Sequence, residues 1–491
     1  MKTKQIKKYL KPLITYAACF FLAISIYGQS FKGTVDNYVQ SSLYLYQCYG
    51  DTLLFADSTI TNKNGEFAFD LSSAVDRKNP AGIYRVILQG NQFFYVLNDG
   101  NPINIRTLYQ PSSFYNIATD SLTVLQSEEN KRFYEFQRIQ QQLNVTNQWL
   151  LQMMRLYPLH DPFHKKIENE YYERYKAMEQ FVKGLQDQGV AAEKIALAYH
   201  QPRNPDWKQP DPWRDSIIAS HYFDHFNPAD SFYMYTNILS EKMDIYLVLR
   251  TNKRDAYGQP VNDEMLFAGA AETFLENTLS VGGSQGEAFE FCLNYFLKKL
   301  SKEHQYNAFM SLYDRWVKTE DSSCEPATTK LNWAREKASV LRGVQIGSIG
   351  PDFEIMESKL KMHELQSDYT LLVFWASWCP HCTKMLPEIK NITDRFNQKQ
   401  VALKTVAISL DTDKEKWQQY VQDNGLFTWL NTSELKGWKG DVSKRYNVYA
   451  TPTMFLLDKD KKIIAKPNNV NQLKEKLAKE KANKVIIDNN Q

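Results

Sequence analysis

Two cysteines, Cys379 and Cys382, are separated by two residues and lie between an apolar, β-prone run and a helical pattern. The apolar run covers residues 371–375, so the sequence predicts a strand that leads directly into a helix. Both thiols then lie at the first helical turn, where unpaired N–H groups and the positive end of the helix dipole favour a thiolate. We therefore predict a redox dithiol in which Cys379 attacks a disulfide and Cys382, one turn later, resolves the mixed disulfide.

The two residues between the cysteines influence the redox potential. Pro380 is acceptable in a first helical turn because its missing N–H would have no partner there. His381 can place a positive charge or a hydrogen-bond donor beside the sulfur of Cys379. Both effects stabilise the reduced, ionised form, and a dithiol whose reduced form is stabilised is an oxidant.

Metal ligation is the alternative explanation of a C-x-x-C pair, since such a pair can be half of a zinc site. A zinc site needs a second Cys or His pair at short spacing, and the nearest other cysteine, Cys324, lies far upstream. His221 and His225 are spaced to share one helical face, but no zincin glutamate and no third ligand accompany them. We therefore expect no metal, and a packing role for the two histidines.

Segments before and after the dithiol complete a resemblance to a known family. The matching residues are Gly347, Pro351-Asp352-Phe353, Phe374-Trp375-Ala376-Ser377-Trp378-Cys379, Pro387, Ala407-Ile408-Ser409-Leu410-Asp411, Trp417, Tyr420, Val421 and Thr451-Pro452. On these motifs residues 345–483 resemble the TlpA/ResA-like envelope thioredoxins, which are thiol–disulfide oxidoreductases. The resemblance covers a little over a quarter of the chain.

The resemblance implies a thioredoxin-like α/β fold and gives roles to several residues near the dithiol. Trp378 shields the site, and Pro380 and His381 modulate it. Thr451 and Pro452 form a cis-proline loop that orients the incoming peptide, the alternative being an ordinary trans proline before a strand. The implied partners are client proteins with thiols or disulfides, and a membrane electron donor or acceptor.

Two positions depart from the family pattern, and both concern the base for the resolving thiol. Val373 occupies the place of a buried carboxylate six residues before the first cysteine, and Met385 replaces a glutamate six residues after it. Glu388 lies close to that second position in the sequence. Deprotonation of Cys382 therefore lacks an obvious base.

The first 28 residues are predicted to be a secretory signal peptide, which places the protein in the periplasm or the periplasm-facing cell envelope. A basic segment with five lysines precedes an apolar stretch over residues 13–27, and Gly28 offers a small residue for cleavage. An uncleaved anchor is one alternative, and lipidation at Cys19, which Tyr16 disfavours, is another. Without those five lysines the chain has 54 basic and 56 acidic residues and no basic block, which argues against a nucleic-acid partner.

The chain as a whole predicts a multidomain α+β protein. Turn dipeptides at Asn64-Gly65 and Asp99-Gly100 separate short alternating strands, and they predict a β-sandwich-like domain that resembles one found in some Gram-negative envelope proteins. A later helical pattern is interrupted by a proline-rich loop at residues 201–213. The predicted parts are a signal peptide (1–28), a β-sandwich-like domain (30–115), a helical middle domain (121–338), a thioredoxin-like domain (345–483) and a tail (484–491).

Three cysteines outside the dithiol and the signal have different surroundings. Cys48 lies in a predicted strand and Cys292 in the apolar run Phe291-Cys292-Leu293, so we expect both to be buried. Cys324 lies between Ser323 and Glu325, so we expect it to be exposed. A disulfide between Cys292 and Cys324 stays open at this point.

The sequence thus predicts an enzyme, a periplasmic thiol–disulfide oxidoreductase that exchanges disulfides with exported proteins. No nucleotide or flavin motif occurs, so no cofactor is expected. The family resemblance favours a reductant, whereas Pro380-His381 favours a disulfide oxidase or isomerase; we expect the reductant. The alternative from another class is an envelope binding or scaffold protein that uses the thioredoxin-like domain as an interaction platform.

Overall fold

The computed structural model describes residues 30–71, 81–111, 113, 115–185, 190–200, 208, 211–253, 259, 261, 263–279, 286–318, 331–355, 359–397 and 402–489. The predicted signal peptide, Cys324 and most of the proline-rich loop lie outside these residues. The chain divides into two compact units, Met1–Leu312 and Tyr313–Gln491, and each is described by itself.

The first unit begins with two four-stranded sheets. The strands are β1 (Ser30–Asp36), β2 (Ser42–Tyr49), β3 (Thr52–Ile60), β4 (Glu66–Asp70), β5 (Gly82–Ile87), β6 (Phe93–Asn98), β7 (Ile103–Leu108) and β8 (Thr123–Gln126). One sheet has the order β4-β1-β7-β8 and the other β3-β2-β5-β6, with only the β1–β7 pair parallel among these neighbours. Inward side chains of both sheets, such as Phe31 and Leu45, share one core, so the β-sandwich-like prediction is confirmed.

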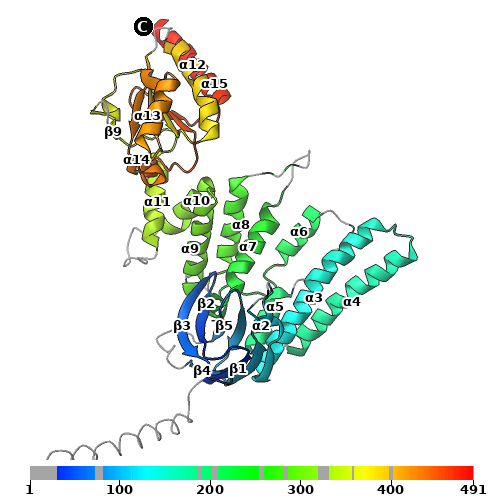
Figure 1. The fold of residues 1–491 in the computed structure, drawn as a ribbon. Coiled ribbons are helices and arrows are strands. Elements are labelled where there is room, and N and C mark those ends of the chain that lie inside the picture. Colours follow the sequence, from blue (N-terminus) through cyan, green and yellow to red (C-terminus); the bar gives the residue numbers. More distant parts are fainter. Residues whose placement is uncertain are drawn as a thin grey trace, which may run out of the picture. The chain divides into compact units, whose positions relative to one another are not determined.

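Apart from α2, which lies between β7 and β8, the helices of the first unit follow the sheets in the chain (Figure 1). They are α2 (Ile117–Asp120), α3 (Glu128–Leu156), α4 (Pro162–Leu185), α5 (Ala191–Tyr199), α6 (Asp211–Ser220), the 3₁₀ turn η3 (Ser231–Tyr235), α7 (Ile238–Thr251), α8 (Glu264–Glu276), α9 (Glu287–Lys302) and α10 (Tyr306–Leu312). Their apolar faces meet around buried aromatic residues such as Phe274 and Phe296, whose ring centroids are 5.6 Å apart. The helical middle predicted from the three- and four-residue spacing is confirmed.

Specific contacts join the sheets to the helices within this unit. Asn130 of α3 accepts a hydrogen bond from the Leu97 N–H and donates one to the Leu97 carbonyl, both at 2.8 Å. Gly50, with φ +58°, donates its N–H to the carbonyls of Met234 and Thr236. A Cβ at Gly50 would lie 2.3 Å from the Phe291 ring, so only glycine fits this turn.

The second unit contains a five-stranded sheet with the order β13-β12-β11-β14-β15. Its strands are β11 (Tyr369–Trp375), β12 (Leu403–Ser409), β13 (Leu430–Ser433), β14 (Thr453–Asp458) and β15 (Ile463–Ala465), and a separate two-stranded ribbon joins β9 (Glu354–Ile355) to β10 (Leu360–Lys361). The central strand β11 pairs parallel with β12 and antiparallel with β14. Every side chain of β11 is buried, which explains its continuous apolar sequence.

Helices and short turns complete the second unit. They are η4 (Tyr313–Val317), α11 (Asn332–Gly343), η7 (Met362–Glu364), α12 (Pro380–Asn397), α13 (Lys414–Asp423), η8 (Leu426–Thr428), η9 (Gly437–Lys439), α14 (Asp441–Arg445) and α15 (Val470–Asn489). Leu386 of α12 and Leu473 of α15 belong to the buried core around β11. The mixed sheet with helices is the thioredoxin-like α/β arrangement that the sequence predicted. Within the described residues, no helix is both long and apolar enough to cross a membrane.

Candidate functional site

The dithiol lies where β11 leads into α12. Strand β11 ends at Trp375, the Cys379 N–H donates to the Ala376 carbonyl at 3.2 Å, and α12 begins at Pro380. Pro387 lies inside α12, as the sequence predicted. The turn therefore places Cys379 just before the helix and Cys382 in its first turn, which confirms the predicted strand–turn–helix unit.

The sulfur of Cys379 lies in a setting that favours its ionised form. Its thiol donates to the Thr451 carbonyl at 3.4 Å and accepts a hydrogen bond from the Cys382 N–H at 3.3 Å. Burial alone would raise the pKa of Cys379, but hydrogen bonds from the Cys382 thiol, Thr451 and the N–H groups of Cys382 and His381 outweigh it. The net effect is a pKa below the ordinary thiol value.

The surroundings of Cys382 favour the protonated thiol, in contrast to those of Cys379. Its side chain is fully buried, whereas Cys379 keeps 6% of its surface exposed. Burial, followed by the hydrogen bond with Cys379, raises the pKa of Cys382 to about 12. Val373 is also fully buried, so the position that the family gives to a carboxylate is apolar here, and Glu388 is exposed.

The proline loop meets the dithiol across the sheet. The Thr451–Pro452 peptide bond is cis, which is the geometry predicted from the sequence. Thr453 begins β14 and pairs with Phe374 of β11, so strand pairing brings the loop to the end of β11 where the dithiol follows. The 3.4 Å contact between Cys379 and Thr451 results from this pairing.

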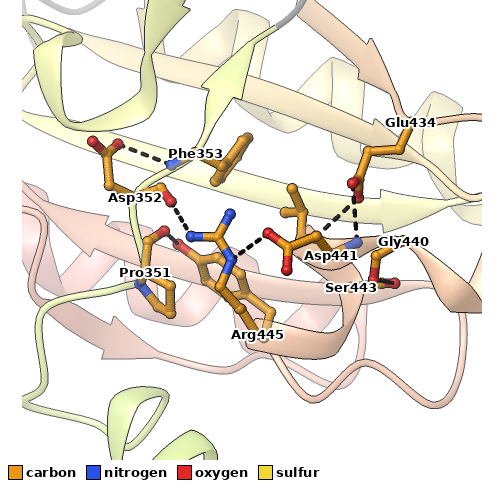
Figure 2. A network of polar contacts seen from close by, with 10 residues as sticks. Pro351, Asp352, Phe353, Glu434, Gly440, Asp441, Ser443 and Arg445 are labelled. Atoms are coloured by element: carbon orange, nitrogen blue, oxygen red, sulfur yellow. Dashed lines mark hydrogen bonds and ion pairs between the residues drawn. The ribbon is translucent and has the colours of Figure 1, made fainter.

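A polar network holds α14, the helix that precedes the proline loop (Figure 2). Arg445 lies between two partners: its Nη1 donates to the Asp352 carbonyl at 2.5 Å and its Nε is 2.8 Å from the Asp441 carboxylate. Glu434 accepts the N–H groups of Asp441 and Val442 at 3.0 and 2.9 Å, which satisfies the start of the helix. The network ties the segment around Asp352 to the chain that leads into the proline loop.

Asp411 lies near the dithiol and was given no role in the sequence analysis. It is the last residue of the motif Ala407-Ile408-Ser409-Leu410-Asp411, which belongs to the family resemblance. Its carboxylate is 1% exposed and accepts three hydrogen bonds. The donors are the Ser377 N–H at 3.0 Å, the Ser377 hydroxyl at 2.6 Å and the Ser409 hydroxyl at 2.6 Å. Because Ser377 lies two residues before Cys379, Asp411 fixes the turn that leads to Cys379.

Replacing Asp411 with alanine is expected to shift the pH dependence of Cys379 alkylation. In the unmodified chain, the pH at which alkylation reaches half of its maximal rate should lie below the ordinary pKa of a cysteine thiol. The reason is that the Cys379 pKa is lowered, so the thiolate persists to lower pH. Without the carboxylate the turn loosens, the N–H groups near the sulfur move away, and the half-maximal pH should rise by about one unit.

The pH profile of iodoacetamide alkylation measures this positioning effect. Asp411→Asn is the control, since its amide can still accept from the Ser377 N–H and donate to the Ser377 hydroxyl. We expect this variant to restore most of the profile. An unchanged profile in Asp411→Ala would limit Asp411 to a role in stability.

The modulating residues predicted at the site are largely exposed. Trp378 is 56% exposed and its ring lies 6.4 Å from that of Trp438, which sequence reasoning missed. His381 and Pro380 are exposed as well. Trp378 directly precedes Cys379 in the chain, and we call this tryptophan pair the aromatic rim; nothing in the local sequence around Trp438 indicated that it lies near Trp378.

The other candidate residues do not form a metal site. Residues 221–225 follow the end of α6 as turns and bends, so the helical spacing considered for His221 and His225 does not occur. His221 contacts Asp224 at 2.8 Å, and the His225 ring lies 4.9 Å from that of His200. Among the described residues, no three His, Cys, Asp or Glu side chains are grouped to hold an ion. Cys48 and Cys292 are buried, as predicted.

Comparisons with known proteins match the region around the dithiol. A family model described as Thioredoxin-like matches residues 367–463. Sporulation thiol-disulfide oxidoreductase A of Bacillus subtilis is 35% identical over 109 residues, which are 22% of this chain and 64% of that protein. The chain therefore spans less than two thirds of the length of this relative.

Two further relatives match a similar share of the chain. Thiol-disulfide oxidoreductase ResA of Bacillus thuringiensis subsp. konkukian is 28% identical over 129 residues, which are 25% of this chain and 68% of that protein. Thioredoxin-like protein YneN of Bacillus subtilis is 30% identical over 122 residues, which are 24% of this chain and 67% of that protein. These matches cover about a quarter of the chain.

Proposed function

This chain belongs to the thioredoxin-like family through its C-terminal domain, and on that premise we propose that it is a thiol–disulfide oxidoreductase acting on exported proteins. The observation that supports the proposal most directly is the asymmetry of the dithiol. Cys379 has a lowered pKa and remains partly exposed, whereas Cys382 is fully buried with a pKa raised to about 12. One sulfur is therefore ready to attack, and the other is protected one helical turn behind it.

The proposed reaction transfers two electrons from the dithiol to a client disulfide. The Cys379 thiolate attacks one client sulfur, a mixed disulfide forms, and the other client sulfur leaves as a thiolate. Cys382 then loses its proton, which the client thiolate can take, and attacks the Cys379 sulfur to release the second client thiol. The client is reduced, the Cys379–Cys382 pair is oxidised, and the reverse sequence oxidises a client.

Client positioning is assigned to the proline loop and the aromatic rim. The Thr451 carbonyl, which faces the nucleophile, is placed to accept a backbone N–H from an extended client segment, and Pro452 shapes the loop. Trp378, the exposed residue directly before Cys379, is proposed to shield the site, and His381 and Pro380 to adjust the stability of the Cys379 thiolate. Because residue 373 is a buried valine and not a carboxylate, the leaving client thiolate is the base proposed for the Cys382 proton.

The proposed location is the periplasm or the periplasm-facing envelope, and the proposed direction is reduction. The basic and apolar N-terminal sequence supports export, and a membrane electron donor would recharge the dithiol, because the sequence carries no nucleotide or flavin motif. The lowered pKa of Cys379 also stabilises the reduced form, which supports the second candidate, a disulfide oxidase or isomerase.

The equilibrium reduction potential of the Cys379–Cys382 pair tests the proposed oxidoreductase activity and its direction. It is measured by titration against glutathione, followed by alkylation of the two thiols. A potential near or below about −250 mV supports the reductant, whereas a value above about −150 mV supports the oxidase or isomerase. A dithiol that forms no reversible internal disulfide would overturn the oxidoreductase proposal itself.

A further inference from the structure

The hairpin formed by α3 and α4 ends in an apolar surface that no other described segment covers. The two helices lie side by side in the first unit and are joined by a short turn (Figure 1). Near that turn they share a small core of their own, which consists of Leu150, Met154, Ile167 and Tyr171. This core stabilises the end of the hairpin locally, so the turn beyond it is a supported structure.

Large apolar side chains at this end point into solvent. We call the hairpin tip the set Trp149, Leu156, Tyr157, Leu159 and Phe163, whose exposed fractions run from 39% to 79%. Soluble proteins rarely gather so many large apolar side chains at one exposed place unless the surface binds something.

The tip is held in shape by its own contacts. The Tyr157 and Phe163 rings are 4.9 Å apart in an edge-to-face arrangement. Buried His164 is hydrogen-bonded through Nδ1 to the Tyr157 carbonyl at 2.8 Å, and Asp161 accepts the Phe163 N–H at 2.8 Å. The apolar surface is therefore presented by an ordered turn.

The charges around the tip are mainly positive. Arg155, Lys165 and Lys166 are exposed, and Asp161 is the only acidic residue from 149 to 167. The next acid, Glu168 of α4, is 3.9 Å from the Lys208 ammonium. The chain from residue 29 onward has more acids than bases, so this local excess departs from the rest of the molecule. Exposed aromatic and aliphatic side chains flanked by lysine and arginine are typical of surfaces that enter the interface of an anionic lipid bilayer.

We propose that the hairpin tip docks on an anionic membrane surface, with Leu156, Leu159 and Phe163 entering the lipid interface. Arg155, Lys165 and Lys166 then face the headgroups, and Trp149 and Tyr157 occupy the interfacial level that suits amphipathic rings. The contact is peripheral and needs no membrane-spanning helix.

The size of the tip favours a membrane over a second protein chain. Two adjacent helix ends, each about 10–12 Å wide, present a face of only a few hundred Å² at most. A stable protein interface covers about 800 Å² on each partner. Shallow insertion of a few side chains into lipid has no such requirement, because each inserted side chain contributes separately.

Local hydrogen exchange of the full chain with lipid vesicles tests the proposal. Residues 13–27 are also apolar, so vesicle binding of the whole chain does not locate the contact, whereas exchange in a peptide covering residues 152–166 does. Vesicles of phosphatidylcholine with phosphatidylglycerol are compared with phosphatidylcholine alone. This readout is independent of the dithiol, so its failure leaves the proposed redox function unaffected.

We expect the 152–166 peptide to exchange at least about tenfold more slowly with anionic vesicles than with neutral ones. The variant Leu156→Ser/Leu159→Ser/Phe163→Ser should lose that protection. The control Val39→Ser/Ile60→Ser/Val248→Ser, which removes equally exposed apolar side chains elsewhere, should keep it.

Three results would overturn the membrane contact. The first is unchanged exchange of this peptide with anionic vesicles, and the second is equal protection by neutral vesicles, which would remove the role of Arg155, Lys165 and Lys166. The third is protection that appears without lipid as the protein concentration rises, because that would assign the tip to a second copy of the chain.

Discussion

Replacing Cys379 with serine is expected to abolish the reduction of a protein disulfide such as insulin, lowering the rate by at least about a thousandfold. The reason is that Cys379 is the thiol with the lowered pKa and with exposed surface, whereas Cys382 is fully buried and its pKa is raised to about 12. A serine hydroxyl in the same place is not ionised at neutral pH, and Cys382 cannot reach a client. The rate of insulin reduction, measured with a chemical reductant that regenerates the dithiol, reports the loss of activity.

Cys382→Ser is the informative counterpart, because it keeps the attacking thiol and removes the resolving one. This variant should accumulate mixed disulfides with clients through Cys379, visible as a shifted band without reducing agent. Cys292→Ser, which changes a buried cysteine of the other unit, should retain full activity. Insulin reduction that survives in Cys379→Ser would contradict the role of Cys379 as the attacking thiol, whereas no reduction by the unmodified chain would favour the scaffold alternative.

Replacing Tyr446 with alanine is expected to cost the second unit about 3–5 kcal/mol of unfolding free energy, as for other buried aromatic residues. The ring is 1% exposed and lies 5.1 Å from Phe455, 5.3 Å from Phe374 and 6.0 Å from Phe353, measured between centroids. Its hydroxyl donates to the Pro351 carbonyl at 2.8 Å. The residue thus joins the segment before the ribbon to both central strands, and its loss leaves a cavity among three aromatic rings.

Tyr446→Phe separates packing from hydrogen bonding. It keeps the ring and loses only the hydroxyl, so we expect a cost of about 1–2 kcal/mol. Hydrogen exchange of β11 amides in the full chain reports the opening free energy of this unit without interference from the other. Equal losses in the two variants would mean that the bond to Pro351, and not the ring, supplies the stability.

Local sequence patterns predicted the elements that carry the dithiol. The apolar, β-prone run at residues 371–375 predicted a strand, which the structure buries on both faces, and the helix that follows begins at Pro380, where proline is well tolerated. The burial of Cys48 was predicted from its place in a strand and that of Cys292 from its apolar neighbours, and both are confirmed. The cis geometry before Pro452 came from the family resemblance, and the structure agrees.

One interpretation was wrong: we expected a packing role for His221 and His225, but both side chains are exposed. His221 and His225 have the spacing of a helical face, but the helix ends at Ser220 and the residues that follow form turns. Their side chains instead find partners in Asp224 and His200, one of which lies in an earlier segment. Periodicity alone did not reveal where the helix stops.

The sequence by itself determined the strand–turn–helix unit and the identity of the two thiols, because those features depend on residues that are neighbours along the chain. Only the tertiary structure decided which residues far apart in sequence surround them. Strand pairing brings Thr451 to Cys379, and the turn after β12 places the Asp411 carboxylate under Ser377. The sequence also did not predict the exposed hairpin tip, because its apolar residues have the same helical spacing as the buried apolar residues of α3 and α4. Only the packing of the folded chain distinguishes exposed from buried positions.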